Sequence, residues 1–232
     1  MNLNHLFDLS LRGRPGKVAL EWQGRTYTFG EMDRRSDRIA QALRKRGLAK
    51  GERLAVYLAN CIEYVDLYFA CLKLGVIFVP VNILYREREL AHILSDAQPR
   101  LLVSAAELPQ LLMEAAAMPA ERPGVFVDGD DGAAIIYTSG TTGVAKGAVL
   151  THNNFAANAV NLATAWQMCE ADRLLLALHF FTYTAWATGC TAGCWRAFGC
   201  ACWSVLRRPG HRKNFSLFGL LFSSGFRQCM CG

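Results

Sequence analysis

One short stretch of the chain combines glycines, hydroxyl side chains and a lysine: Tyr137-Thr-Ser-Gly-Thr-Thr-Gly-Val-Ala-Lys-Gly147. It directly follows the apolar run Ala133-Ala-Ile-Ile-Tyr137, which predicts a buried strand. Glycines let backbone N–H groups approach an anion closely, hydroxyl groups add donors, and lysine adds positive charge. The pattern therefore predicts a polyphosphate-binding loop, called the phosphate loop below, formed by Thr138, Ser139, Gly140, Thr141, Thr142, Gly143 and Lys146.

The spacing of this loop differs from that of the nucleotide-binding P-loop, G-x-x-x-x-G-K-[ST]. Its second glycine is Gly143, and the lysine is followed by Gly147. An ordinary polar turn between two elements is the alternative interpretation, because glycine, serine and threonine are common turn residues.

The elements that must position the loop alternate between strands and helices. Apolar runs predict strands at 54–58, 76–80, 101–103, 133–137 and 174–178. Amphipathic spacing, capping pairs and terminal glycines predict helices from Thr28 to Gly47, from Asn60 to Gly75, over 87–96 and over 155–168. Residues 22–29 predict a hairpin with Gly24 in its turn, and residues 105–130 predict a surface connection. The alternation predicts an α/β fold, with a mostly parallel sheet and flanking helices.

Several motifs together resemble one family. The stretch from Tyr137 to His152 is similar to the phosphate-binding signature of adenylate-forming (AMP-binding) enzymes, which include acyl-CoA synthetases, luciferases and peptide-synthetase adenylation domains. Three upstream segments resemble the family's N-terminal landmarks, in order: Thr26-Tyr-Thr-Phe29, Gly51-Glu-Arg-Leu-Ala-Val-Tyr-Leu-Ala-Asn60 and Ala70-Cys-Leu-Lys-Leu-Gly-Val-Ile-Phe-Val-Pro-Val-Asn82. The resemblance implies the N-terminal part of the family's large domain, incomplete in this chain. One departure is Ala145, where the family usually has a proline that would stiffen the turn.

The resemblance also implies a reaction. A carboxylate attacks the α-phosphate of ATP, bound with Mg²⁺, and gives an acyl-adenylate and pyrophosphate. The thiol of coenzyme A then displaces AMP, so the implied class is an acid–thiol ligase of the acyl-CoA synthetase type. The phosphate loop would hold the β- and γ-phosphates and act electrostatically. The partner would be a small-molecule carboxylic acid, and short, medium, dicarboxylic and long-chain fatty acids all remain open.

Histidine and cysteine side chains give weaker signals. His152 follows the loop at the start of a helix, where capping or packing is a better interpretation than a catalytic base. Asn153 and Asn154 are expected to be cap residues. Cys61 and Cys71 have no metal-ligand companions at the usual spacings, so they are expected to be core thiols and no metal site is predicted.

Charge divides the chain into two parts. The formal net charge is +6, but the residues from Arg173 onward contain seven Lys and Arg and no Asp or Glu. The first 172 residues carry a net charge of about −1, so a nucleic-acid partner is not expected. The start of the chain lacks a basic segment followed by an apolar run, which favours the cytoplasm. Residues 174–195 are uncharged but are diluted by polar residues, so no membrane span is expected.

A shift of the reading frame would explain the unusual composition of the second part. Adenylate-forming enzymes usually have Leu-Pro-Leu-Phe-His-x-x-Gly where this chain has Leu178-His-Phe-Phe-Thr-Tyr-Thr-Ala-Trp186. Codons for the residues from His179, regrouped two bases later, can encode Leu-Phe-His-Val-His-Gly-Leu. We therefore expect a partial AMP-binding domain over 1–178 and an out-of-frame tail over 179–232. An in-frame divergent segment is the alternative.

This division affects the expected function. The family's later nucleotide-binding motifs and C-terminal lysine are not found in the sequence, so no complete catalytic set is predicted and the isolated chain is expected to be inactive. A phosphate loop alone cannot orient nucleotide, acid and thiol together. Two other classes remain open: a non-catalytic nucleotide-binding or interaction module, and a membrane-attached protein anchored by its tail.

Overall fold

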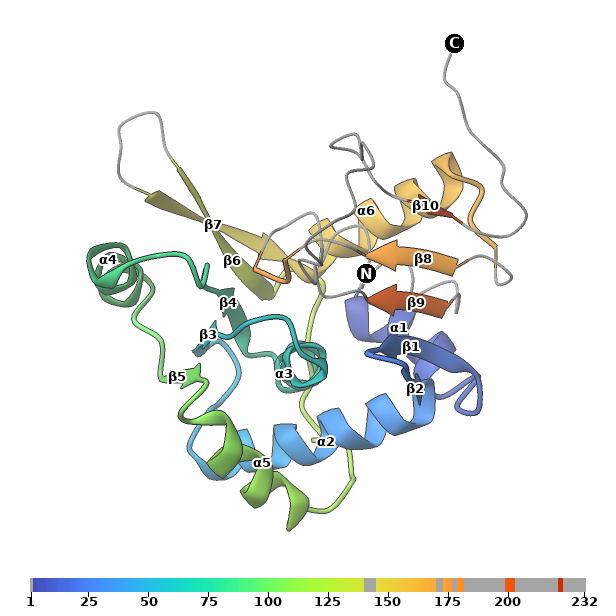
Figure 1. The fold of residues 1–232 in the computed structure, drawn as a ribbon, viewed down its shortest axis with the longest axis horizontal. Helices are drawn as coiled ribbons and strands as arrows, with labels where there is room; N and C mark the ends of the chain where they lie inside the picture. Colours follow the sequence, from blue (N-terminus) through green and yellow to red (C-terminus); the bar gives the residue numbers. More distant parts are fainter. Residues whose placement is uncertain are drawn as a thin grey trace, which may run out of the picture.

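Helices and strands alternate over the first half of the chain in the computed structural model (Figure 1). The structure describes residues 2–139, 145–169, 173–176, 179–181, 199–202 and 221–222. The helices are α1 (Leu3–Leu11), α2 (Phe29–Lys45), α3 (Ile62–Leu74), α4 (Glu87–Ala97), α5 (Leu108–Ala116) and α6 (His152–Ala165). The strands are β1 (Val18–Trp22), β2 (Arg25–Thr28), β3 (Arg53–Tyr57), β4 (Ile77–Pro80), β5 (Leu101–Ser104), β6 (Gly132–Ser139), β7 (Ala145–Thr151), β8 (Arg173–Leu176), β9 (Gly199–Cys202) and β10 (Leu221–Phe222).

The sheet that carries the phosphate loop has the strand order β5-β3-β4-β6-β7. Strands β5, β3, β4 and β6 are parallel, and β7 is antiparallel to β6. Helix α3 connects β3 to β4 and helix α4 connects β4 to β5, in opposite directions along the sheet. Right-handed connections therefore place these helices on opposite faces, as Figure 1 shows. The predicted α/β class, with a mostly parallel sheet and flanking helices, is confirmed.

A second sheet has the order β10-β8-β9-β1-β2. Its β1–β2 hairpin confirms the predicted turn: Gln23 and Gly24 have φ of 50° and 79°, and a tight hairpin turn of this kind needs two positive values. Helix α3 lies between the two sheets (Figure 1). The ring of Phe180 lies 6.4 Å from Trp22 of β1 and 5.6 Å from Tyr64 of α3, measured between centroids, and so connects them.

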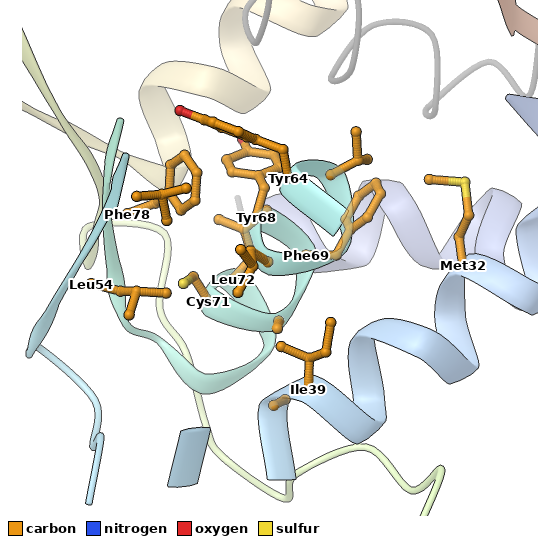
Figure 2. Packing of buried hydrophobic residues seen from close by; sticks show 14 of the residues in the cluster. Met32, Ile39, Leu54, Tyr64, Tyr68, Phe69, Cys71, Leu72 and Phe78 are labelled. Atoms are coloured by element: carbon orange, nitrogen blue, oxygen red, sulfur yellow. The ribbon is translucent and has the colours of Figure 1, made fainter. Parts of the chain in front are cut away.

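Helix α3 is buried around almost its whole circumference, because α2 covers one side and the sheet covers the other (Figure 2). Tyr64 and Tyr68 meet Phe78 of β4 edge-on, with centroids 5.6 and 5.5 Å apart. The apolar spacing that predicts this helix is that of Val65, Tyr68, Phe69 and Leu72, and all four are buried.

The beginning of α2 follows its sequence signal. The Thr28 hydroxyl accepts the N–H of Glu31, while the Glu31 carboxylate accepts the N–H of Thr28 at 2.8 Å. This capping box satisfies two backbone donors that the first turn would otherwise leave unpaired. Helix α2 ends at Lys45, and Gly47 follows with a φ of 86°. The amphipathic spacing that predicts this helix is that of Met32, Ile39, Ala40 and Leu43, and all four are buried.

The capping pair predicted at the start of α3, Asn60 with Glu63, is wrong. The helix begins at Ile62, and Cys61 is its N-cap without a side-chain hydrogen bond. The Asn60 side chain instead accepts the N–H of Phe180 at 2.8 Å, and Glu63 lies 3.3 Å from the Arg35 guanidinium. Long-range partners thus compete successfully with the local capping interaction.

The connection predicted over 105–130 is also wrong in part, because it contains α5. Pro109 lies in the first turn, where its missing N–H costs nothing, and Leu111 and Ala115 are buried. The Arg46 guanidinium of α2 pairs with the Glu114 carboxylate at 2.7 and 2.9 Å. Alanine and leucine favour a helix here, and docking on α2 stabilises it.

Helix α6 begins three residues earlier than predicted. Thr151 is its N-cap and forms a capping box with Asn154, so Asn154 is confirmed as a cap residue. Asn153 is not: its amide donates to the Asp130 carboxylate at 2.7 Å. The strand predicted over 174–178 corresponds to β8, and residues 177 and 178 lie outside the described residues.

Candidate functional site

The β6–β7 hairpin places the two ends of the phosphate loop side by side. Thr138 pairs with Lys146 across the two strands, and Ser139 pairs with Ala145. Opposite residues of an antiparallel pair have Cβ atoms about 5 Å apart. The hairpin therefore brings together Thr138, Ser139 and Lys146, whereas the predicted loop residues Gly140, Thr141, Thr142 and Gly143 lie outside the described residues.

The hydroxyl of Thr138 and the ammonium group of Lys146 share one face of the hairpin. Side chains alternate along a strand, and Ile135 and Tyr137 belong to the cluster under α4. Thr138 must then point to the other face, and its cross-strand partner Lys146 points the same way. Both residues are exposed. A hydroxyl donor beside a cation can bind an anionic oxygen.

Gly147 makes room for the tyrosine that precedes the loop. A Cβ atom at Gly147 would lie 2.8 Å from Cγ2 of Ile135 and 3.0 Å from the ring of Tyr137. The Tyr137 ring therefore packs directly over the glycine on the neighbouring strand. Its hydroxyl donates to the Asp96 carboxylate at 2.6 Å. Burial, with the Asp96 charge beside it, raises the pKa of Tyr137 well above its usual value, so the hydroxyl remains a donor.

Helix α4 makes a second polar contact with the hairpin. Nε2 of His92 lies 2.9 Å from the carbonyl oxygen of Ala145, so this nitrogen carries the proton and donates. Sequence patterns did not indicate His92 or Asp96 as site residues. Their four-residue spacing, which places them on one helix face, was the available signal.

His152 is separated from the loop by the length of β7. It follows Lys146 by six residues, which is about 20 Å in an extended strand. The side chain is fully buried at the start of α6, and neither ring nitrogen has a hydrogen-bond partner among the described residues. Burial lowers the pKa of His152 to about 4, against the opposing effect of Asp131. The expected packing role fits this position, and a base acting at the loop does not.

The cysteines of the described segments are not arranged for chemistry. Cys71 is buried and Cys61 is half-buried, and burial raises the pKa of the Cys61 thiol to about 12. Within the described part of the chain, no group of three or more His, Cys, Asp or Glu could hold a metal ion. Of the cysteines nearer the C-terminus, Cys190, Cys194, Cys229 and Cys231 lie outside the described residues, and Cys200 and Cys202 belong to β9.

Among the described residues, no helix is both long enough and apolar enough to cross a membrane.

Known proteins share this fold and these motifs. ATP-bound MatB from Rhodopseudomonas palustris has a TM-score of 0.78 and 29% identity, over 87% of this chain and 45% of MatB. A feruloyl-CoA synthase of Amycolatopsis sp is 33% identical over 192 residues, 77% of this chain and 39% of the relative. A long-chain-fatty-acid–CoA ligase of Mycobacterium tuberculosis is 32% identical over 184 residues, 69% of this chain and 37% of the relative. By fold, the chain therefore matches the N-terminal part of adenylate-forming enzymes.

The family assignment is direct. The sequence profile described as AMP-binding enzyme matches residues 7–221. The chain belongs to the AMP-binding enzyme family, whose members here include acyl-CoA synthetases and ligases. It spans about two fifths of the length of these curated relatives.

Proposed function

We propose that the chain is part of an acyl-CoA synthetase, an ATP-dependent acid–thiol ligase. A carboxylate would attack the α-phosphate of ATP, forming an acyl-adenylate as pyrophosphate leaves, and the thiol of coenzyme A would then displace AMP. Family membership and the relatives named as CoA synthase and CoA ligase support this proposal. One relative is named for a feruloyl group and another for long-chain fatty acids, so the relatives select no single acid.

The phosphate loop would bind the β- and γ-phosphates of ATP. The observation that carries this role is the exposed Thr138–Lys146 pair at the end of the β6–β7 hairpin. Lys146 would neutralise the charge that develops on the leaving pyrophosphate, and Thr138 would donate its hydroxyl to a phosphate oxygen. Ser139, Gly140, Thr141, Thr142 and Gly143 would add hydroxyl and backbone donors. None of these groups needs to transfer a proton.

Magnesium would enter this site with the nucleotide. The described residues contain no acidic cluster that could hold it alone, and Mg²⁺ commonly keeps most of its contacts to phosphates and water. Its chemistry there would be to neutralise phosphate charge.

Replacing Lys146 tests the loop. Lys146→Ala removes a charge-assisted contact, so the affinity of the 232-residue chain for Mg-ATP should fall about 10- to 100-fold in calorimetry. Lys45→Ala, an exposed lysine of α2, is the matched control and should leave the affinity unchanged. Equal affinities for both variants would mean that Lys146 does not contact the phosphates.

Turnover separates the ligase from a simpler module. We propose that this chain lacks activity by itself, because the loop alone cannot bring nucleotide, acid and thiol together. Carboxylate-dependent release of pyrophosphate by the purified chain would contradict that proposal. A folded chain that binds ATP without turnover and with a defined partner would favour the alternative, a non-catalytic nucleotide-binding or interaction module. Recovery of the chain in the soluble or the membrane fraction tests attachment to membranes. We propose that the chain is located in the cytoplasm.

We also propose that residues 1–178 form a partial AMP-binding domain and that residues 179–232 are read out of frame. The absence of acidic residues beyond Asp172 and the regrouped codons support this division. The family profile extends to residue 221, which favours the alternative of a divergent segment in the correct frame. Resequencing the gene around codons 170–180 decides the matter. An intact frame, with no single-base difference from a complete copy, would exclude the frameshift.

A further inference from the structure

Helix α4 contacts the β6–β7 hairpin on both sides of the Thr138–Lys146 pair. Tyr137, which pairs with Gly147, donates its hydroxyl to Asp96 at 2.6 Å. Ala145, which pairs with Ser139, accepts the Nε2–H of His92 at 2.9 Å. One contact therefore holds β6 just before Thr138, and the other holds β7 just before Lys146.

Apart from the ladder between β6 and β7, few interactions among the described residues fix this end of the hairpin. Strand β7 is at the edge of its sheet, and its residues from Lys146 to Val149 are exposed. Val149 is 58% exposed, so apolar packing contributes little to the order of this strand. Edge positions with little burial open locally at low free-energy cost. The two hydrogen bonds to a docked helix then add support that the ladder alone does not give the strand ends.

Helix α4 is itself a firm support. Ile93 and Ala97 are 1% and 7% exposed, and both pack in the cluster beneath the helix. His92 and Asp96 are the neighbours of these anchors in sequence, so apolar contacts hold their backbone in place. Removing their polar atoms should leave the helix docked.

We propose that His92 and Asp96 are positioning residues for the Thr138–Lys146 pair. They hold the backbone of Ala145 and the side chain of Tyr137, and so set the separation and orientation of Thr138 and Lys146. This inference rests on the proposed function, because the geometry matters for binding only if the loop takes phosphates. Binding groups must be held to a fraction of an ångström to be effective.

Hydrogen exchange of the 232-residue chain measures directly how much the hydrogen bonds from α4 protect the amides of β7. Amides of β7 should exchange about two- to fivefold faster in Asp96→Ala, in Tyr137→Phe and in His92→Ala, and about tenfold faster in the double variant with His92→Ala and Asp96→Ala. Amides of β3 and β4 should not change. Ser95→Ala, an exposed change on the same helix, is the matched control and should behave like the native chain.

Conservative variants distinguish positioning from general stability. Asp96→Asn keeps an acceptor for the Tyr137 hydroxyl and His92→Gln keeps a donor at similar reach, so both should restore slow exchange and native affinity for Mg-ATP. The alanine variants should bind Mg-ATP about threefold to tenfold more weakly while keeping the urea midpoint of the native chain. Unchanged exchange in the double variant, or equal acceleration in β3, β4 and β7, would overturn the proposal.

The two proposals can fail separately. Suppose that the native chain fails to bind Mg-ATP while the amides of β7 still exchange faster in the double variant. In that case the phosphate role is wrong, and the ordering of β7 by α4 is still supported. If Lys146→Ala abolishes binding while the double variant changes neither exchange nor affinity, the loop role stands and the positioning role is wrong.

Discussion

The two faces of the β5-β3-β4-β6-β7 sheet bury very different amounts of apolar surface. The face under α3 belongs to a large cluster that also contains residues of α1, α2 and the second sheet (Figure 2). Among the described residues, the cluster under α4 has six buried members: Ala55, Val79, Val81, Ile93, Ala97 and Ile135. Burial of apolar area is the main stabilising term in folding, so the α3 face should dominate global stability.

The two faces also treat polar groups differently. On the α3 side, between α3 and α2, the ammonium group of Lys73 is buried and lies 2.7 Å from Asp33 and 2.6 Å from Asp37. Asp66 is buried as well and pairs with Arg35 at 2.6 Å. Around α4, the polar contacts to the hairpin are partly open to solvent. The α3 side therefore contributes most to the fold, and under the positioning proposal the α4 side adjusts the local order of the hairpin.

The largest effect should come from the α3 face. Phe69 is 1% exposed and meets the ring of Phe7 edge-on at 5.0 Å, so Phe69→Ala leaves a cavity in the main cluster. The free energy of unfolding should fall by about 3–5 kcal/mol, measured by urea denaturation. Phe126→Ala, at a site 80% exposed, is the matched control and should change it by less than about 0.5 kcal/mol. Similar losses of unfolding free energy in the two variants would show that Phe69 contributes no more to stability than an exposed residue.

The next effect should come from the buried charges between α3 and α2. Lys73→Met removes the cation and leaves Asp33 and Asp37 without their shared partner. Stability should fall by about 3 kcal/mol, because an uncompensated buried carboxylate is costly. Adding Asp37→Asn to Lys73→Met should recover part of the loss, and Lys45→Met at an exposed site should cost little. A neutral outcome for Lys73→Met alone would mean that the network contributes nothing to stability.

The α3 face was also the part best predicted from sequence. The Thr28–Glu31 pair and the apolar spacing of α2 and α3 are local signals, and the packing agrees with them. Where tertiary contacts compete, local signals failed: Asn60 is used by Phe180, and the alanine-rich segment at α5 becomes a helix against α2. Lys73 carried no signal at all, because its partners lie 36 and 40 residues away.

The hairpin was predicted less completely. The types of Thr138 and Lys146 indicated a phosphate site, but β7 has no alternating apolar pattern, and its strand character comes from pairing with β6. Its support from α4 depends on contacts across 41 and 53 residues, which no local spacing encodes. Residue types therefore indicated the chemistry, while long-range pairing determines its geometry.

The smallest of the three effects concerns pH, and His152 carries it at the end of the hairpin opposite the loop. Burial lowers its pKa from about 6.5 to about 4, against the opposing effect of Asp131, whose carboxylate pairs with Lys50 at 2.6 Å. Between these values the unfolded chain binds more protons than the folded chain. The stabilisation is therefore fully present above pH 6.5 and is lost as the pH falls towards 4. Lowering the pH from 7 to 5 should remove about 2 kcal/mol at this site.

Asp66 of α3 should change stability with pH in the opposite direction. Burial raises its pKa to about 6, although the Arg35 guanidinium opposes the shift, so the folded chain binds more protons and gains stability as the pH falls through 6. The two groups partly cancel in the native chain, and variants must separate them. His152→Met should reduce the loss of unfolding free energy between pH 7 and 5 by about 2 kcal/mol, whereas Asp66→Asn should increase it by about 1 kcal/mol. A difference between native chain and His152→Met that does not vary with pH would show that His152 is not held neutral by burial.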